Sequence, residues 1–309
     1  METFSAPAEK PSALSGEVFE AILDGLDPDS LEIDSLTPES PKKVTIFNNG
    51  LDSVRAVIDS VKRLSHGDEW IGAWYTVTDK NFVEAACEAV AKGARITLYA
   101  DYYTLSAQCC GGKDALEALA KGGVAVYVFS PVGKNVSQDK RPVLHTKMAL
   151  ITKGTKKTVI QGSANLTKAA STVNNEMITH FPDDDEAYAT LKNFIDTKIA
   201  PKSLPLADCF SIPDSQEVCL TKLFSGSQSI KTPKKGLHSI LPSSDYNIQS
   251  ILAERIEKTG KNGEIIVFTM TLSSYAIIDS LIKSANNGSL VQLLIDAHGA
   301  EKFTPILWD

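Results

Sequence analysis

The strongest constraint on the fold is the regular alternation of short apolar runs with amphipathic runs from residue 44 onward. Apolar runs of strand length lie at 44–47 (VTIF), around 70–75, and at 94–101 (ARITLYAD), 124–130 (VAVYVFS), 143–152 (VLHTKMALIT) and 157–164. Helical runs lie between or after them, at 52–64, 82–93, 113–123 and near 184–197. Strands separated by helices predict an α/β sandwich, because the connecting helices cover the faces of the sheet.

The opening pattern returns near the carboxyl end of the sequence. Residues 263–299 are expected to form a strand, a helix, a glycine turn and a strand, in the same order as residues 68–102. Asp296 follows Asp101 by 195 residues (296 minus 101), and Gly288 follows Gly93 by the same interval. This pattern predicts an internal duplication. Because identities are few, a chance resemblance between two strand–helix–strand units stays open as the alternative.

Composition divides the chain into four parts. Residues 1–41 hold ten acidic side chains against one lysine and are rich in Pro and Ser, which predicts a flexible acidic arm. Residues 201–245 contain five prolines and are expected to be a linker or a surface excursion. The intervening residues 42–200 then form one complete lobe, and residues 246–309 form the start of a second one.

One short segment carries most of the predicted chemistry. In VLHTKMALIT, His145 and Lys147 are two residues apart and would project from the same face of a strand. Neutral histidine can attack phosphorus, and lysine with an amide donor can stabilise charge on the nonbridging oxygens, so no metal or other cofactor is required. A histidine with no partners would more often be structural, so the residues that follow decide the interpretation.

Two further groups follow in order. Gly162-Ser163-Ala164-Asn165-Leu166-Thr167 is a glycine-led turn with small polar residues, and Asn174-Asn175-Glu176 comes next. With His145-x-Lys147, this set resembles the phospholipase D superfamily, whose signature is H-x-K-x4-D, then G-S-x-N and a downstream carboxylate. The resemblance covers residues 43–200 and implies an α/β/α sandwich with a mixed sheet.

The resemblance also implies a role for each residue. His145 would form a phosphohistidine, while Lys147 and Asn165 would hold the phosphate. Ser163 and Gly162 would support the phosphate pocket, and Glu176 would orient a catalytic histidine by a hydrogen bond. Thr167 is expected to satisfy local backbone groups instead.

The sequence departs from the signature at one position, where Thr152 stands in place of the aspartate. The tyrosyl-DNA phosphodiesterase branch also lacks that aspartate, and its H-T-K-M wording is similar to the His145–Met148 segment here. The departure therefore does not exclude activity, although it weakens the assignment to a phospholipase.

Two-lobed members of the superfamily use a second histidine as general acid and base. The interval of 195 residues would place it near position 340, beyond the 309 residues of this sequence. The expected partners are therefore the phosphodiester substrate and either a second copy of the chain in a homodimer or a missing C-terminal half. The partial second lobe favours the missing half.

Three functions remain open at this level. The leading prediction is a phosphodiesterase that cleaves or transfers a phospholipid. The first alternative is a nuclease or a tyrosyl-DNA phosphodiesterase-like enzyme, favoured by seven Lys and Arg residues against one acid in residues 134–157, which predict either a locally positive surface or a solvated loop. The second is a non-catalytic binding module that keeps the fold.

The expected location is cytoplasmic, with peripheral membrane contact left open. No stretch approaches the roughly 18 apolar residues that a membrane-spanning helix needs, and the first residues do not have the pattern of a signal peptide. The five cysteines have neither paired spacing nor ligand spacing for zinc, so all are expected to be reduced.

Overall fold

A computed structural model describes residues 44–106, 108–133, 141–213, 247–269 and 272–295. The predicted acidic arm at 1–41 and most of the predicted linker lie outside these residues. The strands are β1 (Thr45–Phe47), β2 (Glu69–Trp74), β3 (Arg95–Asp101), β4 (Ala125–Phe129), β5 (Lys147–Lys153), β6 (Lys156–Gly162), β7 (Ile178–Phe181), β8 (Ser203–Pro205), β9 (Glu264–Thr269) and β10 (Leu290–Ile295).

The α-helices are α2 (Gly50–Lys62), α3 (Lys80–Ala91), α4 (Tyr102–Leu105), α5 (Gly112–Lys121), α6 (Lys168–Thr172), α7 (Asp185–Phe194), α8 (Leu206–Cys209), α9 (Ile248–Glu257) and α10 (Tyr275–Asn286). A π-helical turn, η2 (Ile195–Ile199), and a 3₁₀ turn, η3 (Ala200–Lys202), continue α7. Polar caps set several helix starts: the side chains of Asn49 and Asp79 accept backbone N–H groups at the beginnings of α2 and α3.

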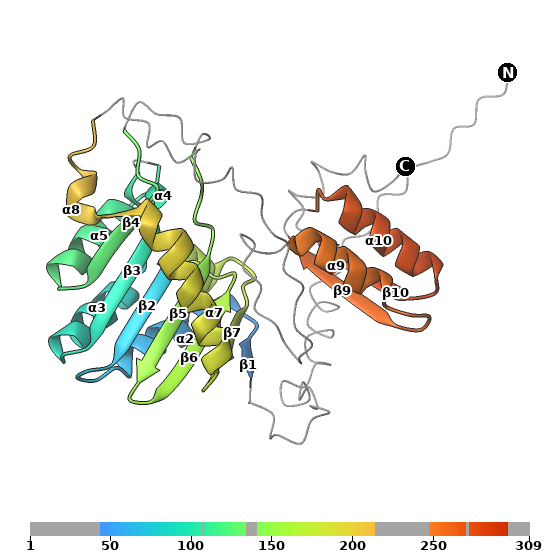
Figure 1. Ribbon diagram of the computed structural model, residues 1–309, viewed down its shortest axis with the longest axis horizontal. Coiled ribbons are helices and arrows are strands. Elements are labelled where there is room, and N and C mark those ends of the chain that lie inside the picture. Colours follow the sequence, from blue (N-terminus) through green and yellow to red (C-terminus); the bar gives the residue numbers. More distant parts are fainter. Residues whose placement is uncertain (1–43, 107, 134–140, 214–246, 270–271, 296–309) are drawn as a thin grey trace. The chain divides into compact units, whose positions relative to one another are not determined.

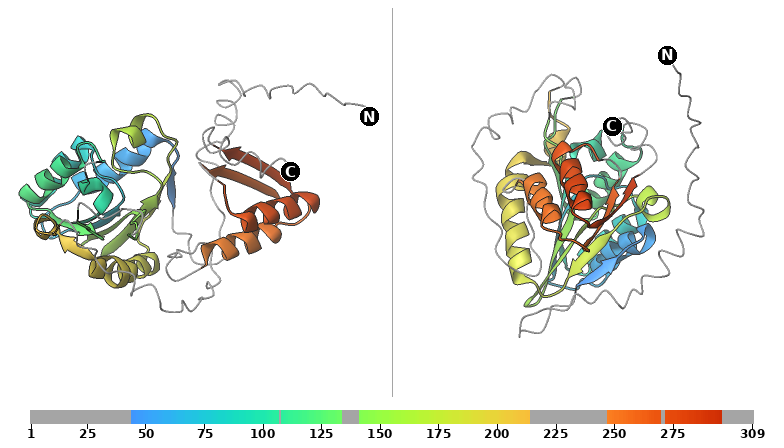
Figure 2. Two further views of the ribbon diagram at one scale, coloured as in Figure 1. Left: turned by 90° about the horizontal axis from the view of Figure 1, so that it is seen from above. Right: turned by 90° about the vertical axis from the view of Figure 1, so that its right-hand side faces the viewer.

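The first lobe is built on a mixed sheet of eight strands in the order β1-β7-β6-β5-β2-β3-β4-β8 (Figure 1). Strands β2, β3 and β4 are parallel, because helices α3 and α5 connect them. Strands β5, β6 and β7 are antiparallel neighbours. Helices α2, α3 and α5 cover one face of this sheet and α7 covers the other (Figure 2). The predicted α/β/α sandwich with a mixed sheet is therefore confirmed.

The lobe continues past the expected boundary at residue 200. Strand β8 pairs with β4, with Val128 opposite Leu204, and Leu206 and Cys209 of α8 are buried in the core. The prolines of this segment do not prevent this arrangement, since β8 is an edge strand, where a missing backbone N–H is tolerated.

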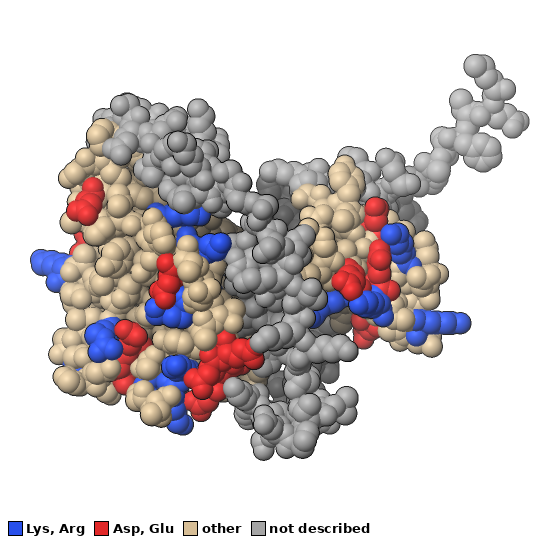
Figure 3. Space-filling view, in the orientation of Figure 1, with Lys and Arg blue, Asp and Glu red and all other residues tan. Residues whose placement is uncertain are grey.

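Of the two alternatives for the basic stretch, a locally positive surface or a solvated loop, the positive surface does not form among the described residues of 141–157. Arg141 and Lys147 are buried, and Lys153, Lys156 and Lys157 each have an aspartate oxygen within 4.0 Å. On the face of the lobe that carries α7, basic and acidic side chains are interspersed (Figure 3). The many lysines of this stretch thus reflect local ion pairing and burial more than an anion-binding surface.

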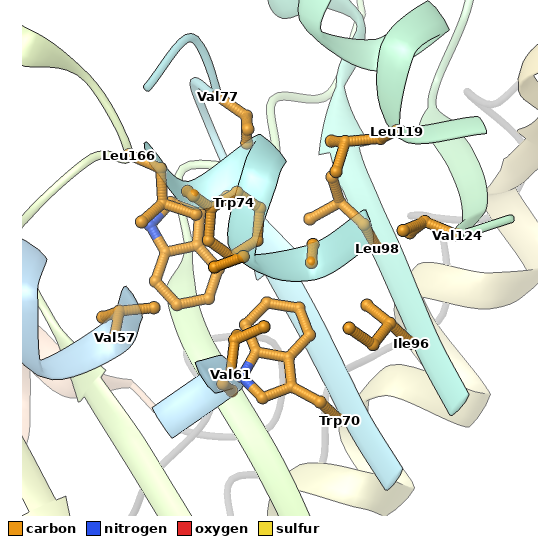
Figure 4. Packing of buried hydrophobic residues seen from close by; sticks show 14 of the residues in the cluster. Val57, Val61, Trp70, Trp74, Val77, Ile96, Leu98, Leu119, Val124 and Leu166 are labelled. Carbon is orange, nitrogen blue, oxygen red and sulfur yellow. The ribbon is translucent and has the colours of Figure 1, made fainter. Parts of the chain in front are cut away.

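The main core lies between the sheet and helices α2, α3 and α5. The indole rings of Trp70 and Trp74 on β2 are stacked with a centroid distance of 5.8 Å (Figure 4). Gly72 lies between them, and a Cβ at this position would come within 2.1 Å of the Trp70 ring. Glycine is therefore needed here, so that a tryptophan of β2 can lie flat against its own strand.

The second lobe repeats this plan in part. Strands β9 and β10 form a parallel pair, with α9 and α10 packed together and apolar side chains of both strands in a small core. Strand β9 begins 195 residues after β2 (264 minus 69), α10 the same distance after α3 (275 minus 80), and β10 after β3 (290 minus 95). The strand registers also correspond at this interval.

The turns of the two lobes match as well. The backbone N–H of Gly67 donates to the carbonyl of Gly93, and that of Asn262 donates to Gly288, again 195 residues on. All four residues have positive φ. Chance resemblance between two strand–helix–strand units does not require identical spacing of left-handed turns, so the structure supports the duplication.

Candidate active site

All predicted site residues lie along one edge of the first sheet, the edge formed by the carboxyl ends of its parallel strands β2, β3 and β4. The parallel strand β2 ends there, β5 begins there, and β6 ends there beside the start of β7, because Lys147 pairs with Trp74 and Gly162 with Ile178. The side chains come from the segments that enter or leave this edge, and they are His145, Lys147, Gly162, Ser163, Asn165 and Glu176. In α/β sheets this is the edge where ligands bind.

His145 and Lys147 are in direct contact. The Lys147 Nζ atom lies 3.2 Å from Nδ1 and 3.2 Å from Nε2 of the imidazole, and it donates to the His145 carbonyl at 3.1 Å. His145 is exposed and immediately precedes β5, whereas Lys147 is the first residue of the strand and is only 5% exposed. The two side chains share one site although His145 lies outside the strand.

The surroundings keep this histidine neutral. Partial burial lowers the pKa of His145, the Lys147 ammonium lowers it further, and the Asp101 carboxylate raises it. Burial also lowers the pKa of Lys147 to about 8, an effect that the Glu176 carboxylate opposes. At neutral pH an uncharged imidazole therefore lies beside a mostly protonated amine.

Tyr75 is a site residue that the sequence interpretation missed. Its ring lies 4.8 Å from the His145 ring, centroid to centroid, and the Lys147 Nζ lies 5.5 Å from the Tyr75 ring centroid. Tyr103 stacks on Tyr75 at 5.1 Å. The position of Tyr75, directly after β2 at the same edge as His145, was the available signal, but it needed the strand order to be known.

The glycine-led turn packs tightly against β7. A Cβ on Gly162 would come within 2.0 Å of the Met177 carbonyl oxygen, so glycine allows the close approach of the two strands. The Ser163 N–H donates to that same carbonyl at 2.8 Å, and the Ser163 hydroxyl oxygen accepts from the Met177 N–H at 2.9 Å. Gly162 therefore allows the turn to pack closely against the Met177 backbone.

Glu176 is the buried acceptor of this turn. One carboxylate oxygen accepts from the Ser163 hydroxyl at 2.6 Å and the other from the Asn174 amide at 3.1 Å. Through its charge Glu176 raises the pKa of Lys147. Among the described residues its carboxylate is thus engaged with Ser163, Asn174 and Lys147, so the expected orienting bond to a histidine stays a prediction.

Asn165 is hydrogen-bonded to the segment that follows β2. Its side-chain oxygen accepts the Thr76 N–H at 3.3 Å, and the neighbouring Ala164 carbonyl accepts the Trp74 indole N–H at 3.0 Å. The amide of Asn165 is therefore held by its oxygen, which leaves its NH₂ group as the end suited to donate to an anion. Thr167 accepts the Ala170 N–H and begins α6, in agreement with the local role expected for it.

Thr152 lies far from these groups. It is five residues beyond Lys147 on β5, so it belongs to the opposite face of the strand, near its other end. Its hydroxyl is 2.9 Å from the Tyr188 hydroxyl of α7. The position that departs from the signature thus joins strand to helix and does not contribute to the site.

Within the described ranges, no group of three or more His, Cys, Asp and Glu side chains is arranged to hold a metal ion. Cys87, Cys109, Cys110 and Cys209 are free thiols. No helix in the part of the chain that the structure describes is long and apolar enough to cross a membrane.

Comparisons with known proteins agree with this fold. Residues 61–197 match the family model described as cardiolipin synthase, PLD-like domain. No curated protein matches the sequence. Among solved structures, the phosphatidylserine synthase of Haemophilus influenzae Rd KW20 is 12% identical with a TM-score of 0.59, covering 83% of this chain and 62% of its own.

Two other solved structures are similar in part. The polyphosphate kinase of Porphyromonas gingivalis is 14% identical with a TM-score of 0.50, covering 92% of this chain and 41% of its own. Nuc from Salmonella typhimurium, a phospholipase D family member, is 17% identical with a TM-score of 0.43, covering 53% of this chain and 98% of its own. The family model at residues 61–197 places the lobe that carries His145 and Lys147 in the phospholipase D superfamily, and the phosphatidylserine synthase structure shares its fold.

Proposed function

We propose that this chain supplies one half of a phosphodiesterase site in which His145 is the nucleophile and a phospholipid is the substrate. The observation that carries the proposal is the contact between the His145 imidazole and the Lys147 ammonium. A neutral ring nitrogen has the lone pair that attack on phosphorus needs, and the adjacent cation attracts the phosphate and stabilises its negative oxygens.

The reaction proceeds in two steps. A ring nitrogen of His145 forms a bond to phosphorus while the bond between phosphorus and the leaving alcohol breaks, and the alcohol oxygen takes a proton. Water or a second alcohol then attacks phosphorus, loses a proton, and displaces the histidine nitrogen. The products are the alcohol and a phosphomonoester, or a new diester when an alcohol attacks.

The second step and the proton transfers need a general acid and base. A second histidine, from the remainder of a two-lobed protein or from another copy of the chain, is the group proposed for this role. The duplication supports the first source, because β9, α10 and β10 repeat β2, α3 and β3. Asn165 and Lys147 hold the phosphate during both steps.

The phospholipid is favoured over a nucleic acid on two grounds. The matching family model and the structure with the highest TM-score reported above both carry the names of phospholipid-synthesising proteins. A nucleic-acid enzyme also needs an exposed positive track, and the described lysines and arginine of 141–157 are buried or close to aspartates.

The test is detection of the covalent phospho-enzyme by intact-mass spectrometry. The wild-type chain is mixed with a short-chain phosphatidylcholine, and in parallel with a short single-stranded DNA and with bis(4-nitrophenyl) phosphate. His145→Ala is the test variant, and His66→Ala is the matched control, because His66 is also exposed but lies at the opposite end of β2.

A phosphatidyl adduct in the wild type and in His66→Ala, but not in His145→Ala, supports the proposal. An adduct with DNA alone supports the nuclease alternative and overturns the substrate assignment. A folded wild-type chain that forms no adduct with any of the three probes contradicts the proposed nucleophile and favours the non-catalytic alternative.

A further inference from the structure

A fully buried carboxylate lies just outside the site. Asp101 ends β3 and is 0% exposed. One of its oxygens accepts the Tyr103 N–H at 2.8 Å, and the other accepts the Leu144 N–H at 2.7 Å. Leu144 directly precedes His145, so one hydrogen bond separates this carboxylate from the backbone of the proposed nucleophile.

Arg141 forms an ion pair with Asp101. Its guanidinium binds both oxygens of Asp101 in a bidentate ion pair, and it also donates to the Pro142 carbonyl at 3.2 Å. Both side chains are almost fully buried, at 3% and 0% exposure. A buried ion pair adds little net stability compared with apolar residues, because both charges lose their water. A contribution to stability alone therefore does not explain this ion pair.

The ion pair fixes a segment that has no regular structure of its own. Residues 141–146 belong to neither a helix nor a strand, and Lys147 is the first residue held by the ladder with β2. Asp101 binds the guanidinium of Arg141 at the beginning of this segment and the backbone N–H of Leu144 within it. Tyr103, bound to Asp101 through its backbone, stacks on Tyr75, which contacts the His145 ring.

We propose that Asp101 is a positioning residue for His145, which it acts on through Arg141 and the Leu144 backbone. It holds the imidazole against Lys147 and Tyr75 in the orientation required for attack on phosphorus. The catalytic consequence rests on the proposed function, whereas the positioning itself does not. Displacement of a reacting group by about 1 Å costs on the order of 100-fold in rate, so a rigid segment here has a direct kinetic value.

The charges around His145 allow the positioning to be measured without activity. The groups that face it are Lys147 on β5, Tyr75 after β2, and Asp101 and Tyr103 at the end of β3, while Glu176 acts on Lys147 and Arg141 on Asp101. Of these, Lys147 lowers the pKa of His145 and Asp101 raises it. Loss of the Asp101 charge with the segment still in place therefore lowers the histidine pKa, whereas release of the segment takes the ring away from burial and from Lys147, the two larger effects, and raises the pKa.

The experiment compares Asp101→Asn with the wild type. Asp184→Asn is the matched control, because Asp184 is also buried and also accepts a backbone N–H, that of Ala187, but at the start of α7 near the other end of the sheet. Since Asp101→Asn leaves Arg141 buried without its carboxylate, a second variant combines Asp101→Asn with Arg141→Met. Folding of each variant is checked by thermal unfolding.

Two readouts are taken. The first is the pH titration of the His145 ring by NMR, assigned with His145→Ala. The second is the rate of adduct formation with bis(4-nitrophenyl) phosphate as a function of its concentration. In Asp101→Asn we expect a higher pKa of His145, because the released ring moves away from Lys147, and a maximal rate reduced on the order of 100-fold, with the half-saturating concentration little changed. Asp184→Asn is expected to keep wild-type values in both.

If Asp101→Asn does not fold, the double variant decides the matter, with the same loss of maximal rate expected. A folded variant with an unchanged maximal rate overturns the positioning role, whether its His145 pKa equals that of the wild type or is lowered by the loss of charge alone. A wild-type chain that forms no adduct contradicts the proposed function alone, and the NMR titration then still tests the role of Asp101.

Discussion

The Nζ atom of Lys147 lies 3.2 Å from each ring nitrogen of His145. A lysine at this distance repels a second positive charge, so it favours the uncharged form of the imidazole, the form that attacks phosphorus. The same lysine is buried at the start of β5 and remains beside the phosphate that the histidine would bind. Under the proposed function, this one side chain would both keep the nucleophile uncharged and bind the phosphate of the substrate.

Replacement of Lys147 by methionine is expected to raise the pKa of His145. The substitution removes the nearest positive charge and keeps a side chain of similar length, so the remaining effect of burial persists while the repulsion is lost. An NMR titration of the histidine rings measures the change. Lys153→Met, at the far end of the same strand, is the control and should leave the titration unchanged; an unaltered pKa in Lys147→Met would contradict the contact.

The depressed pKa of Lys147 also predicts a pH dependence of stability. Its value is about 8 in the folded chain against 10.5 for the unperturbed group. The unfolded chain therefore binds the proton more tightly, which disfavours the folded state below about pH 8, and stability is gained as the pH rises from about 8 to 10.5.

This gain is about 3 kcal/mol for a shift of that size. It is measured as the difference in free energy of unfolding between the wild type and Lys147→Met, by urea denaturation at pH 7 and at pH 10. We expect the difference to move in favour of the wild type at the higher pH. A difference that does not change with pH would show that Lys147 has an ordinary pKa.

Gly162→Ala should destabilise the turn that carries Ser163. The new methyl group would lie within 2.0 Å of the Met177 carbonyl oxygen, a backbone atom that can move only if β6 and β7 separate. A loss of about 1–3 kcal/mol in the free energy of unfolding is expected, as for other overpacked sites. Gly260→Ala is the control, because its added Cβ has no neighbour within 4 Å. Equal stability of the two variants would be incompatible with the close approach at Gly162.

Thr152→Val should reduce stability but not adduct formation. The substitution removes the hydrogen bond to Tyr188, which contributes about 1 kcal/mol, and it changes nothing at the edge of the sheet where His145 lies. Denaturant unfolding measures the first effect, and intact-mass detection of the phospho-enzyme measures the second. A strong decrease in adduct formation by a stably folded Thr152→Val chain would show that Thr152 does contribute to the active site.

Much of the fold follows from local pattern. Apolar and amphipathic runs predicted most strands and the principal helices of the first lobe, and the spacing of Gly93 and Gly288 predicted the repeated unit. Periodicity succeeds for these elements because each buries its own apolar face. It missed β7, a strand of four residues, and β8, where three residues pair with β4 at the edge of the sheet, since so short a strand has no period to detect.

The order of residues along the sequence indicated the chemistry of the site. His145, Lys147, Asn165 and Glu176 were recognised from their types and spacing. Two features could not be recognised in this way. Whether the lysines of 141–157 are exposed depends on which aspartates fold beside them, and whether Thr152 matters depends on which face of β5 it occupies.

The sequence by itself determined the α/β class, the repeat and the residues proposed to act on a phosphodiester, because these depend on local periodicity and on side-chain chemistry. Only the tertiary structure decided which distant residues surround His145. Tyr75 and Asp101 precede it by 70 and 44 residues (145 minus 75 and 145 minus 101), and they reach it because β2, β3 and β5 are neighbouring strands. Strand order is set by packing across the whole sheet, and no local stretch of sequence encodes it.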